Sequence, residues 1–191
     1  MPIALRIGSL LLLLTVTAAA QSAAPATPPC SQSEYRQLDF WVGEWTLTWP
    51  AAKAGDPENK ASNSIRKELG DCVIEENFDG SNSGGLLGKS VSMYNSRTGK
   101  WHQTWVDNQG AYLELAGGWD GKEFHLWREG KNNKGQVVQQ RMIFKNITAD
   151  SFDWSWEVSN DQGKTWQVQW PIHYTRKKSS VRVPGSQWRF R

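Results

Sequence analysis

Glutamate and histidine in strand-like segments are the residues of this chain best suited to acid–base chemistry. Glu76 lies in CVIEENF (72–78) and shares the period-two face of Ile74 and Phe78, which favours an inward position. A carboxylic acid buried in this way has a raised pKa, and with a His on a neighbouring strand it would supply an acid and a base. A structural role is the alternative, because an inward Glu in a barrel often satisfies an Arg or a Trp N–H.

Aromatic residues provide a second kind of candidate site. The chain has 12 Trp in 191 residues. Most of them must fill the core, but a subset would suit a cavity, since aromatic rings offer stacking area and a small barrel leaves room for one ligand. We predict a small-molecule site made from rings and orienting polar groups: Glu76, Tyr94, Trp101, Gln103, Trp105, Glu114, Trp127 and Trp156. The sequence leaves open which face looks inward in 100–106, 111–117 and 122–128.

The stretch SNDQGKTW (159–166) fits the Asp-box pattern Ser-x-Asp-x-Gly-x-Thr-Trp of sialidases and related propellers. A propeller repeats such a motif in several blades over several hundred residues. This chain carries one copy and is too short for that architecture. We therefore interpret Asp161, Gly163 and Trp166 as a tight, self-bonded hairpin without a catalytic role.

Motifs for metal, nucleotide or nucleophile chemistry are missing. Two cysteines are too few for a Cys-based zinc site, and no pair of the three His has ligand spacing. There is no G-x-S-x-G or G-x-G-x-x-G, and SNSGGLLGKS (81–90) has its glycines too close together for a P-loop. We predict no metal and no cofactor. Haem is a minor option, with His102, His125 or His173 as its axial ligand.

The elements that must position these side chains read as strands almost throughout. Aromatic and β-branched residues fill ten short segments: 44–49, 64–69, 72–78, 88–94, 100–106, 111–117, 122–128, 136–146, 151–158 and 165–175. Alternation is cleanest in the last two segments. In 151–158 the residues expected to share one face are Phe152, Trp154, Trp156 and Val158. In 165–175 they are Trp166, Val168, Trp170, Ile172 and Tyr174.

Short Gly- and Asn-containing turns join these segments, which predicts a meander. Closure would remove the exposed edges. We therefore expect an all-β fold: an antiparallel up-and-down β-barrel of about ten strands with a short N-terminal helix over 31–41. Ser33 is the candidate cap of that helix, and 51–63 is expected to be a mobile loop.

The stretch DFWVGEWTLTW (39–49) carries the clearest resemblance. Its Gly43-x-Trp45 is similar to the opening of lipocalins and other calycin-type barrels. In those folds the Trp closes one barrel end and stacks on an Arg of the last strand, a cation–π contact worth about 0.5–2 kcal/mol. Arg176 stands where that partner would be. The resemblance implies structural roles for Gly43, Trp45 and Arg176 and a calycin/lipocalin-like barrel.

The chain more closely resembles a family of exported bacterial proteins of unknown function. The resemblance covers most of 34–177 and rests on LDFWVGEW (38–45), GDCVIEE (70–76), GKSVSMYN (88–95), GKWHQTWVDNQG (99–110) and SNDQGKTW (159–166). It implies export and a calycin-like barrel. It transfers no catalytic residue.

The termini suggest export as well. Residues 1–20 read as a signal peptide cleaved near Ala20, with a short membrane anchor as the alternative, and 21–30 reads as a Pro/Ala linker. The barrel domain would span 31–177 and a basic tail 178–191. We expect a periplasmic or secreted protein with no further membrane span.

The two cysteines and the charge distribution fit an exported domain. If Cys30 and Cys72 pair, they close a loop of about 42 residues, worth roughly 4 kcal/mol in the chain-entropy model; two unpaired thiols, or a lipidated Cys30 despite a poor lipobox, are the alternatives. Residues 21–175 hold 15 Lys and Arg against 19 Asp and Glu, so basic excess is confined to the tail. We expect no nucleic-acid partner.

Three functions are therefore in competition. The first is a barrel that binds a small apolar or aromatic ligand in an aromatic-lined cavity. The second is an acid–base enzyme that uses the same cavity. The third is an envelope protein whose outer surface binds a partner or a glycan. The sequence does not decide the oligomeric state.

Overall fold

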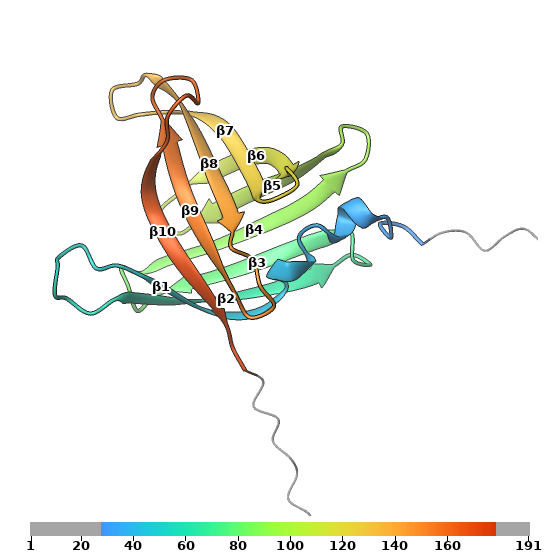
Figure 1. The fold of residues 1–191 in the computed structure, drawn as a ribbon, viewed down its shortest axis with the longest axis horizontal. Coiled ribbons are helices and arrows are strands. Elements are labelled where there is room, and N and C mark those ends of the chain that lie inside the picture. The colour runs from blue at the N-terminus through green and yellow to red at the C-terminus, as the bar shows by residue number, and fades with distance from the viewer. Residues whose placement is uncertain (1–27, 179–191) are drawn as a thin grey trace, which may run out of the picture.

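A computed structural model describes residues 28–178 (Figure 1). The expected signal peptide, most of the linker and the tail after Lys178 lie outside the described residues. Ten antiparallel strands close into one barrel in which each strand pairs with its sequence neighbours and β1 pairs with β10. The up-and-down barrel expected from the turn-linked segments is thus confirmed.

The strands and turns have the following bounds: η1 Ser33–Arg36, η2 Asp39–Trp41, β1 Gly43–Trp49, β2 Asn59–Glu68, β3 Val73–Gly80, β4 Leu86–Asn95, β5 Lys100–Asp107, β6 Tyr112–Trp119, β7 Phe124–Lys131, β8 Val137–Lys145, β9 Ser151–Ser159 and β10 Gln167–Arg176. The N-terminal segment forms two 3-10 turns rather than the single helix expected over 31–41. The Ser33 side chain makes no capping bond and instead donates to Glu34. β2 begins at Asn59, so the end of the expected 51–63 loop is strand.

Cross-strand register fixes which side chains point inward. Opposed residues share a face of the sheet, and one row, Leu126–Met142–Trp156–Trp170, faces the interior. The next row, Trp127–Arg141–Glu157–Val168, faces outward. In β9 the inward set is the one that its alternation predicts.

A β-bulge in β10 overturns the second predicted face. Val168 pairs with Glu157, whereas Trp170 pairs with the next residue of β9, Trp156, so Gln169 is an extra residue on β10. A bulge of this kind breaks the period-two pattern. Val168 is therefore exposed on the outer surface, and Trp166 also lies outside, against Arg141. The prediction that both share the face of Trp170 is wrong.

One end of the barrel is closed by the 3-10 turns. Trp41 and Trp45 are buried there, and the guanidinium of Arg176 lies 4.1 Å from the Trp45 ring centroid. Arg176 also donates to the carbonyls of Phe40 and Val42. Gly43 has a φ of 138°, and a Cβ on it would overlap Arg176 Nη1. The contact between Arg176 and Trp45 therefore leaves no room for a larger residue at position 43.

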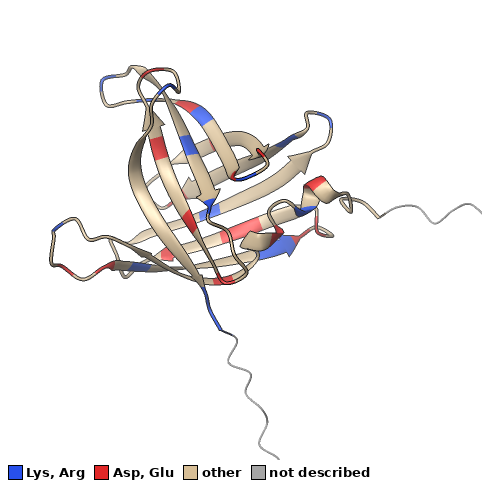
Figure 2. Cartoon of the chain, in the orientation of Figure 1, with Lys and Arg blue, Asp and Glu red and all other residues tan. Residues whose placement is uncertain are grey.

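A disulfide ties the N-terminal segment to the same end. Cys30 bonds to Cys72 at the β2–β3 connection, which confirms the expected pairing. Arg36 strengthens the junction by donating to the carbonyls of Cys30 and Asp71. Basic and acidic residues are interspersed along the barrel (Figure 2). Within residues 28–178, no helix has the length and apolar character needed to cross a membrane.

Candidate functional site

An aromatic cavity of about 210 Å³ lies inside the barrel. It lies between the layer of Trp41 and Phe144, next to the closed end, and the opposite end, where β3–β4 and β5–β6 turn. Five indole rings dominate the wall. The lining residues are Trp41, Glu76, Phe78, Leu86, Trp105, Asp107, Leu113, Met142, Phe144, Trp154, Trp156, Trp170, Ile172 and Tyr174.

Edge-to-face packing holds the indole rings in place. The Trp170 ring centroid lies 5.8 Å from that of Trp154 and 6.0 Å from that of Phe78, with interplanar angles near perpendicular. Aromatic pairs prefer such geometry, and each pair adds about 0.5–1.5 kcal/mol beyond area burial. Trp105 lies across Gly88, where a Cβ would overlap the indole ring. The cavity wall is therefore a preformed surface.

A buried hydrogen-bond network surrounds the carboxyl of Glu76 inside the barrel. Asn63 Nδ2 donates to Glu76 Oε1 at 2.6 Å, and Ser90 Oγ donates to Glu76 Oε2 at 2.6 Å. Asn63 Nδ2 also lies 3.2 Å from the Tyr174 hydroxyl oxygen. No cation touches the Glu76 carboxyl among these contacts. Its solvation inside the protein thus comes from neutral dipoles.

Burial raises the pKa of Glu76 to about 7 against the two hydrogen bonds, which act to lower it. The same burial, together with the charge of Glu76, raises the pKa of Tyr174 well above 10. Near neutral pH the Glu76 carboxyl is thus divided between its two protonation states while Tyr174 keeps its proton. The cavity contains one titratable carboxyl that changes charge in the physiological range.

Three polar atoms near this network have no partner within residues 28–178. They are Trp41 Nε1, Asn63 Oδ1 and Gln103 Oε1. Trp41 also lines the cavity. A buried donor without an acceptor costs free energy, about 1–3 kcal/mol from mutational series. An occupant with an acceptor beside the Trp41 indole would remove that cost.

The structure divides the predicted ligand residues into three groups. Glu76, Trp105 and Trp156 line the cavity. Tyr94, Trp101 and Gln103 point inward but pack elsewhere: Tyr94 against Tyr35, Trp101 onto Gln37, and Gln103 onto Ser92. Glu114 and Trp127 are exposed, because the register of β5, β6 and β7 turns both to the outer face.

Several residues of the cavity and of the network around Glu76 were not predicted as site residues. Trp154 and Trp170 are on faces that alternation identified, so their signal was present. Met142 lies in the segment 136–146, for which no face was predicted, and Leu86 precedes the predicted strand 88–94. Asn63 fell in the stretch assigned to a loop, and nothing in its neighbourhood indicates that it meets Glu76.

The three histidines lie outside the barrel. His173 Nδ1 bonds to Asp153 at 2.7 Å on the exposed face, and His125 Nε2 lies 3.0 Å from Asp120 Oδ2. His102 is exposed in β5. The Glu–His pair considered for acid–base chemistry, and a His-ligated haem in the cavity, are therefore both excluded for these residues. Among residues 28–178, no three His, Cys, Asp or Glu side chains are grouped to hold a metal ion.

Fold and cavity together define the class of this protein: a small, closed up-and-down β-barrel with an internal aromatic cavity that contains the buried carboxyl of Glu76. No protein-family model matches the chain, and no curated protein matches it either.

Proposed function

We propose that this protein binds a small, mostly apolar molecule inside the barrel. The observation that carries the proposal is the preformed cavity of about 210 Å³, walled by Trp105, Trp154, Trp156 and Trp170. An apolar cavity of about 150 Å³ holds a benzene-sized molecule. The volume thus fits a ligand with one ring and a short substituent.

The polar groups at the cavity support a ligand with one hydrogen-bonding end. An ionised Glu76 accepts a hydrogen bond from a hydroxyl or amine of the ligand, and Trp41 Nε1 offers a donor to an acceptor atom. The remaining lining groups are apolar apart from Asp107 and Tyr174. Small-molecule sites commonly combine apolar area with a few polar groups that set orientation.

The first test is native mass spectrometry of the mature protein purified from its source compartment, followed by denaturing extraction. We expect one stoichiometric small molecule. The second test is calorimetry with p-cresol and toluene, which differ by one hydroxyl; p-cresol should bind about tenfold more tightly. Glu76→Gln should weaken p-cresol binding, and the exposed control Glu114→Gln should not. An empty protein that binds neither compound would overturn the proposal.

Acid–base catalysis by Glu76 is the second candidate, favoured by its pKa of about 7 in an apolar cavity. No His reaches the cavity, so Glu76 would act as the base alone. The test reaction is exchange of the α-protons of cyclohexanone in D₂O, followed by proton NMR. The carboxylate would remove a C–H proton, the electron pair would move onto the carbonyl oxygen, and a deuteron would return to carbon. Exchange that is unchanged in Glu76→Gln would sink this candidate.

We infer that the protein acts after export into an oxidising compartment. The Cys30–Cys72 disulfide supports this, since such bonds persist outside the reducing cytosol. The signal-like sequence of residues 1–20 points the same way. Membership of the exported bacterial family of unknown function is likewise a proposal. Amino-terminal sequencing of the protein from its periplasm or medium should begin near residue 21.

A further inference from the structure

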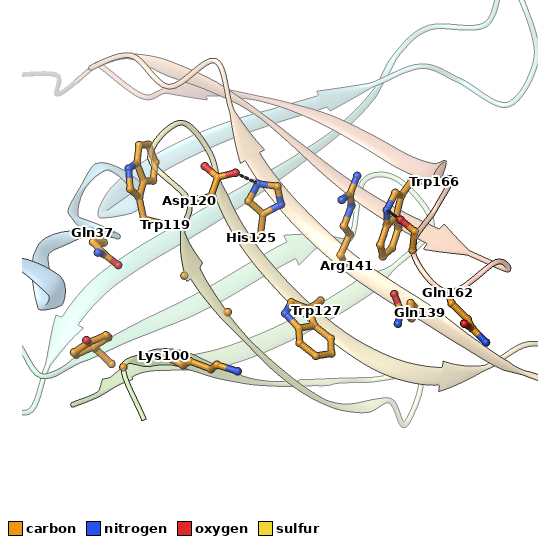
Figure 3. A pocket seen from close by; sticks show the side chains of 15 residues that line it. Gln37, Lys100, Trp119, Asp120, His125, Trp127, Gln139, Arg141, Gln162 and Trp166 are labelled. Carbon is orange, nitrogen blue, oxygen red and sulfur yellow. Dashed lines mark hydrogen bonds and ion pairs between the residues drawn. The ribbon is translucent and has the colours of Figure 1, made fainter. Parts of the chain in front are cut away.

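A second aromatic site lies on the outside of the barrel, in a groove of about 700 Å³ over β6, β7 and β8 (Figure 3). β6 and β7 pair through only four residue pairs, Ala116–Trp127 to Trp119–Phe124. The groove extends from the closed-end rim to the β9–β10 hairpin. It has no lining residue in common with the cavity. It is therefore a separate feature of the fold.

Indole rings form the floor and ends of this groove, and two of them are exposed. Trp127 is 48% exposed and Trp119 is 40% exposed. Trp166 stands at the other end, where its Nε1 donates to the Gly163 carbonyl at 3.1 Å. Exposed tryptophans gathered in one groove are unusual on a protein surface and indicate an interaction site.

The Asp-box hairpin holds Trp166 in position. Asp161 accepts hydrogen bonds from the backbone N–H and hydroxyl of Thr165 and from the Ser159 hydroxyl. These bonds lower the pKa of Asp161 to about 2, the Thr165 side chain contributing most. The carboxylate is thus a permanent acceptor at working pH. The hairpin motif gives the groove a rigid wall.

Arg141 is fixed beside this wall. Its guanidinium lies 3.9 Å from the Trp166 ring centroid, and Nε and Nη2 donate to Glu157 Oε2 at 2.9 and 2.7 Å. Glu157 is itself buried and accepts from Ser155. Within residues 28–178, Arg141 Nη1 donates no hydrogen bond to the protein. A rigid donor is therefore presented to whatever occupies the groove.

The charges of the groove cancel. Lys100 and Arg141 carry positive charge, while Asp120 lines the groove and Glu157 lies beneath Arg141. Gln139 and Gln162 add planar amides that both donate and accept hydrogen bonds. A polyanion such as nucleic acid would find no net positive field here. A neutral occupant with many hydroxyls fits this lining.

We propose that the groove binds a neutral oligosaccharide. A pyranose ring with equatorial substituents has flat C–H faces, which pack on an indole, and hydroxyls around its edge, which suit Arg, Gln and Asp side chains. Trp127 and Trp166 would carry two sugar units. Arg141 and the amides would bind their hydroxyls. A β-1,4-linked chain offers such faces on successive units.

The experiment uses the hexasaccharides of β-1,4-linked glucose and of β-1,4-linked N-acetylglucosamine as probes, with α-1,6-linked glucose of equal length as the comparison. Isothermal calorimetry should show binding of at least one β-linked probe. Amide NMR shifts should cluster in β7, β8 and the β9–β10 hairpin. Saturation of the inner cavity with p-cresol should leave this binding unchanged, which separates the two proposals.

Trp127→Ala should lower the affinity for the β-linked probe by at least about tenfold, as does loss of an aromatic anchor in other interfaces. Tyr112→Ala is the matched control, because Tyr112 is 62% exposed and lies outside the groove. The affinity of Tyr112→Ala for the β-linked probe should equal that of the unchanged protein. No binding of either β-linked probe at millimolar concentration would overturn the proposal. An affinity for the β-linked probe that Trp127→Ala leaves unchanged would also overturn it.

Discussion

The inner cavity and the outer groove share strands β4, β5, β6 and β8 but differ in how their charged groups are stabilised. On β8 the inward Met142 follows the outward Arg141, and on β9 the inward Trp156 precedes the outward Glu157. Each strand thus supplies both sites through its period of two. Inside, the Glu76 carboxyl accepts hydrogen bonds from Asn63 and Ser90 and contacts no cation among residues 28–178. Outside, the guanidinium of Arg141 forms an ion pair with the carboxylate of Glu157.

This contrast follows from the cost of burying charge. A buried carboxyl without a cation keeps its proton to higher pH, because neutral dipoles replace only part of the lost hydration. Glu157 is also buried, yet it faces the Arg141 guanidinium at 2.7 Å. The Glu76 carboxyl can therefore change its charge near pH 7.

The largest expected difference is in stability. Phe144 is fully buried between the cavity and the closed end, so Phe144→Ala should cost about 3–5 kcal/mol in the free energy of unfolding. Trp127→Ala on the outer row should cost no more than about 0.5 kcal/mol. Urea denaturation followed by circular dichroism measures both. Equal losses would mean that Trp127 is a packing residue and would remove the basis for a second site.

The next effect is the pH dependence of stability. The pKa of Glu76 is about 7 in the folded protein against 4.5 when unfolded. The contribution of Glu76 to the free energy of unfolding is therefore complete below pH 4.5 and is lost as the pH rises through 7. The total loss is about 3 kcal/mol.

Glu76→Gln should lack this loss, because a Gln amide donates to Ser90 while its oxygen accepts from Asn63. Denaturation at pH 5 and pH 8 measures the change, with exposed Glu114→Gln as the control. If the unchanged protein and Glu76→Gln lose stability in parallel between these pH values, Glu76 is not the titrating group.

A third variant narrows the inner site alone. In Gly88→Ala the new Cβ would meet the Trp105 ring, so the indole must move into the cavity. Overpacking of this kind costs about 1–3 kcal/mol. p-Cresol affinity should fall by about tenfold or more, while hexasaccharide binding stays the same. Calorimetry with both probes measures the two responses, and a parallel fall of both affinities would show that the sites are coupled.

The sequence predicts the barrel well because local pattern and global closure agree. The alternation of Phe152, Trp154 and Trp156, the short turns, and the pairing of Trp45 with Arg176 all indicate the structure that is found. β10 shows the limit. Its letters keep alternating through Val168, but the bulge at Gln169 shifts the face, and a bulge depends on how the partner strand is spaced.

The candidate site could be predicted only in part, because a buried polar network is a property of distant segments. Glu76 was placed inward by its neighbours in the chain. Asn63, its partner, is 13 positions away on another strand, in a stretch of small polar residues that reads as a loop. Glu114 also alternates with leucines, as an inward acid would, yet the register of β6 turns it to solvent. Only the register separates these two cases.

The smallest expected effect tests how far the hairpin serves the outer site alone. Ser159 is buried; its hydroxyl donates to Asp161 and accepts from the Gly163 N–H at 2.8 Å. Ser159→Ala should therefore cost about 1 kcal/mol of stability. The looser hairpin should lower hexasaccharide affinity by about two- to fivefold, with p-cresol affinity unchanged, because Trp166 belongs to the outer row and Trp170, beyond the bulge, to the inner one. A fall in p-cresol affinity instead would show that the bulge transmits the position of the hairpin into the cavity.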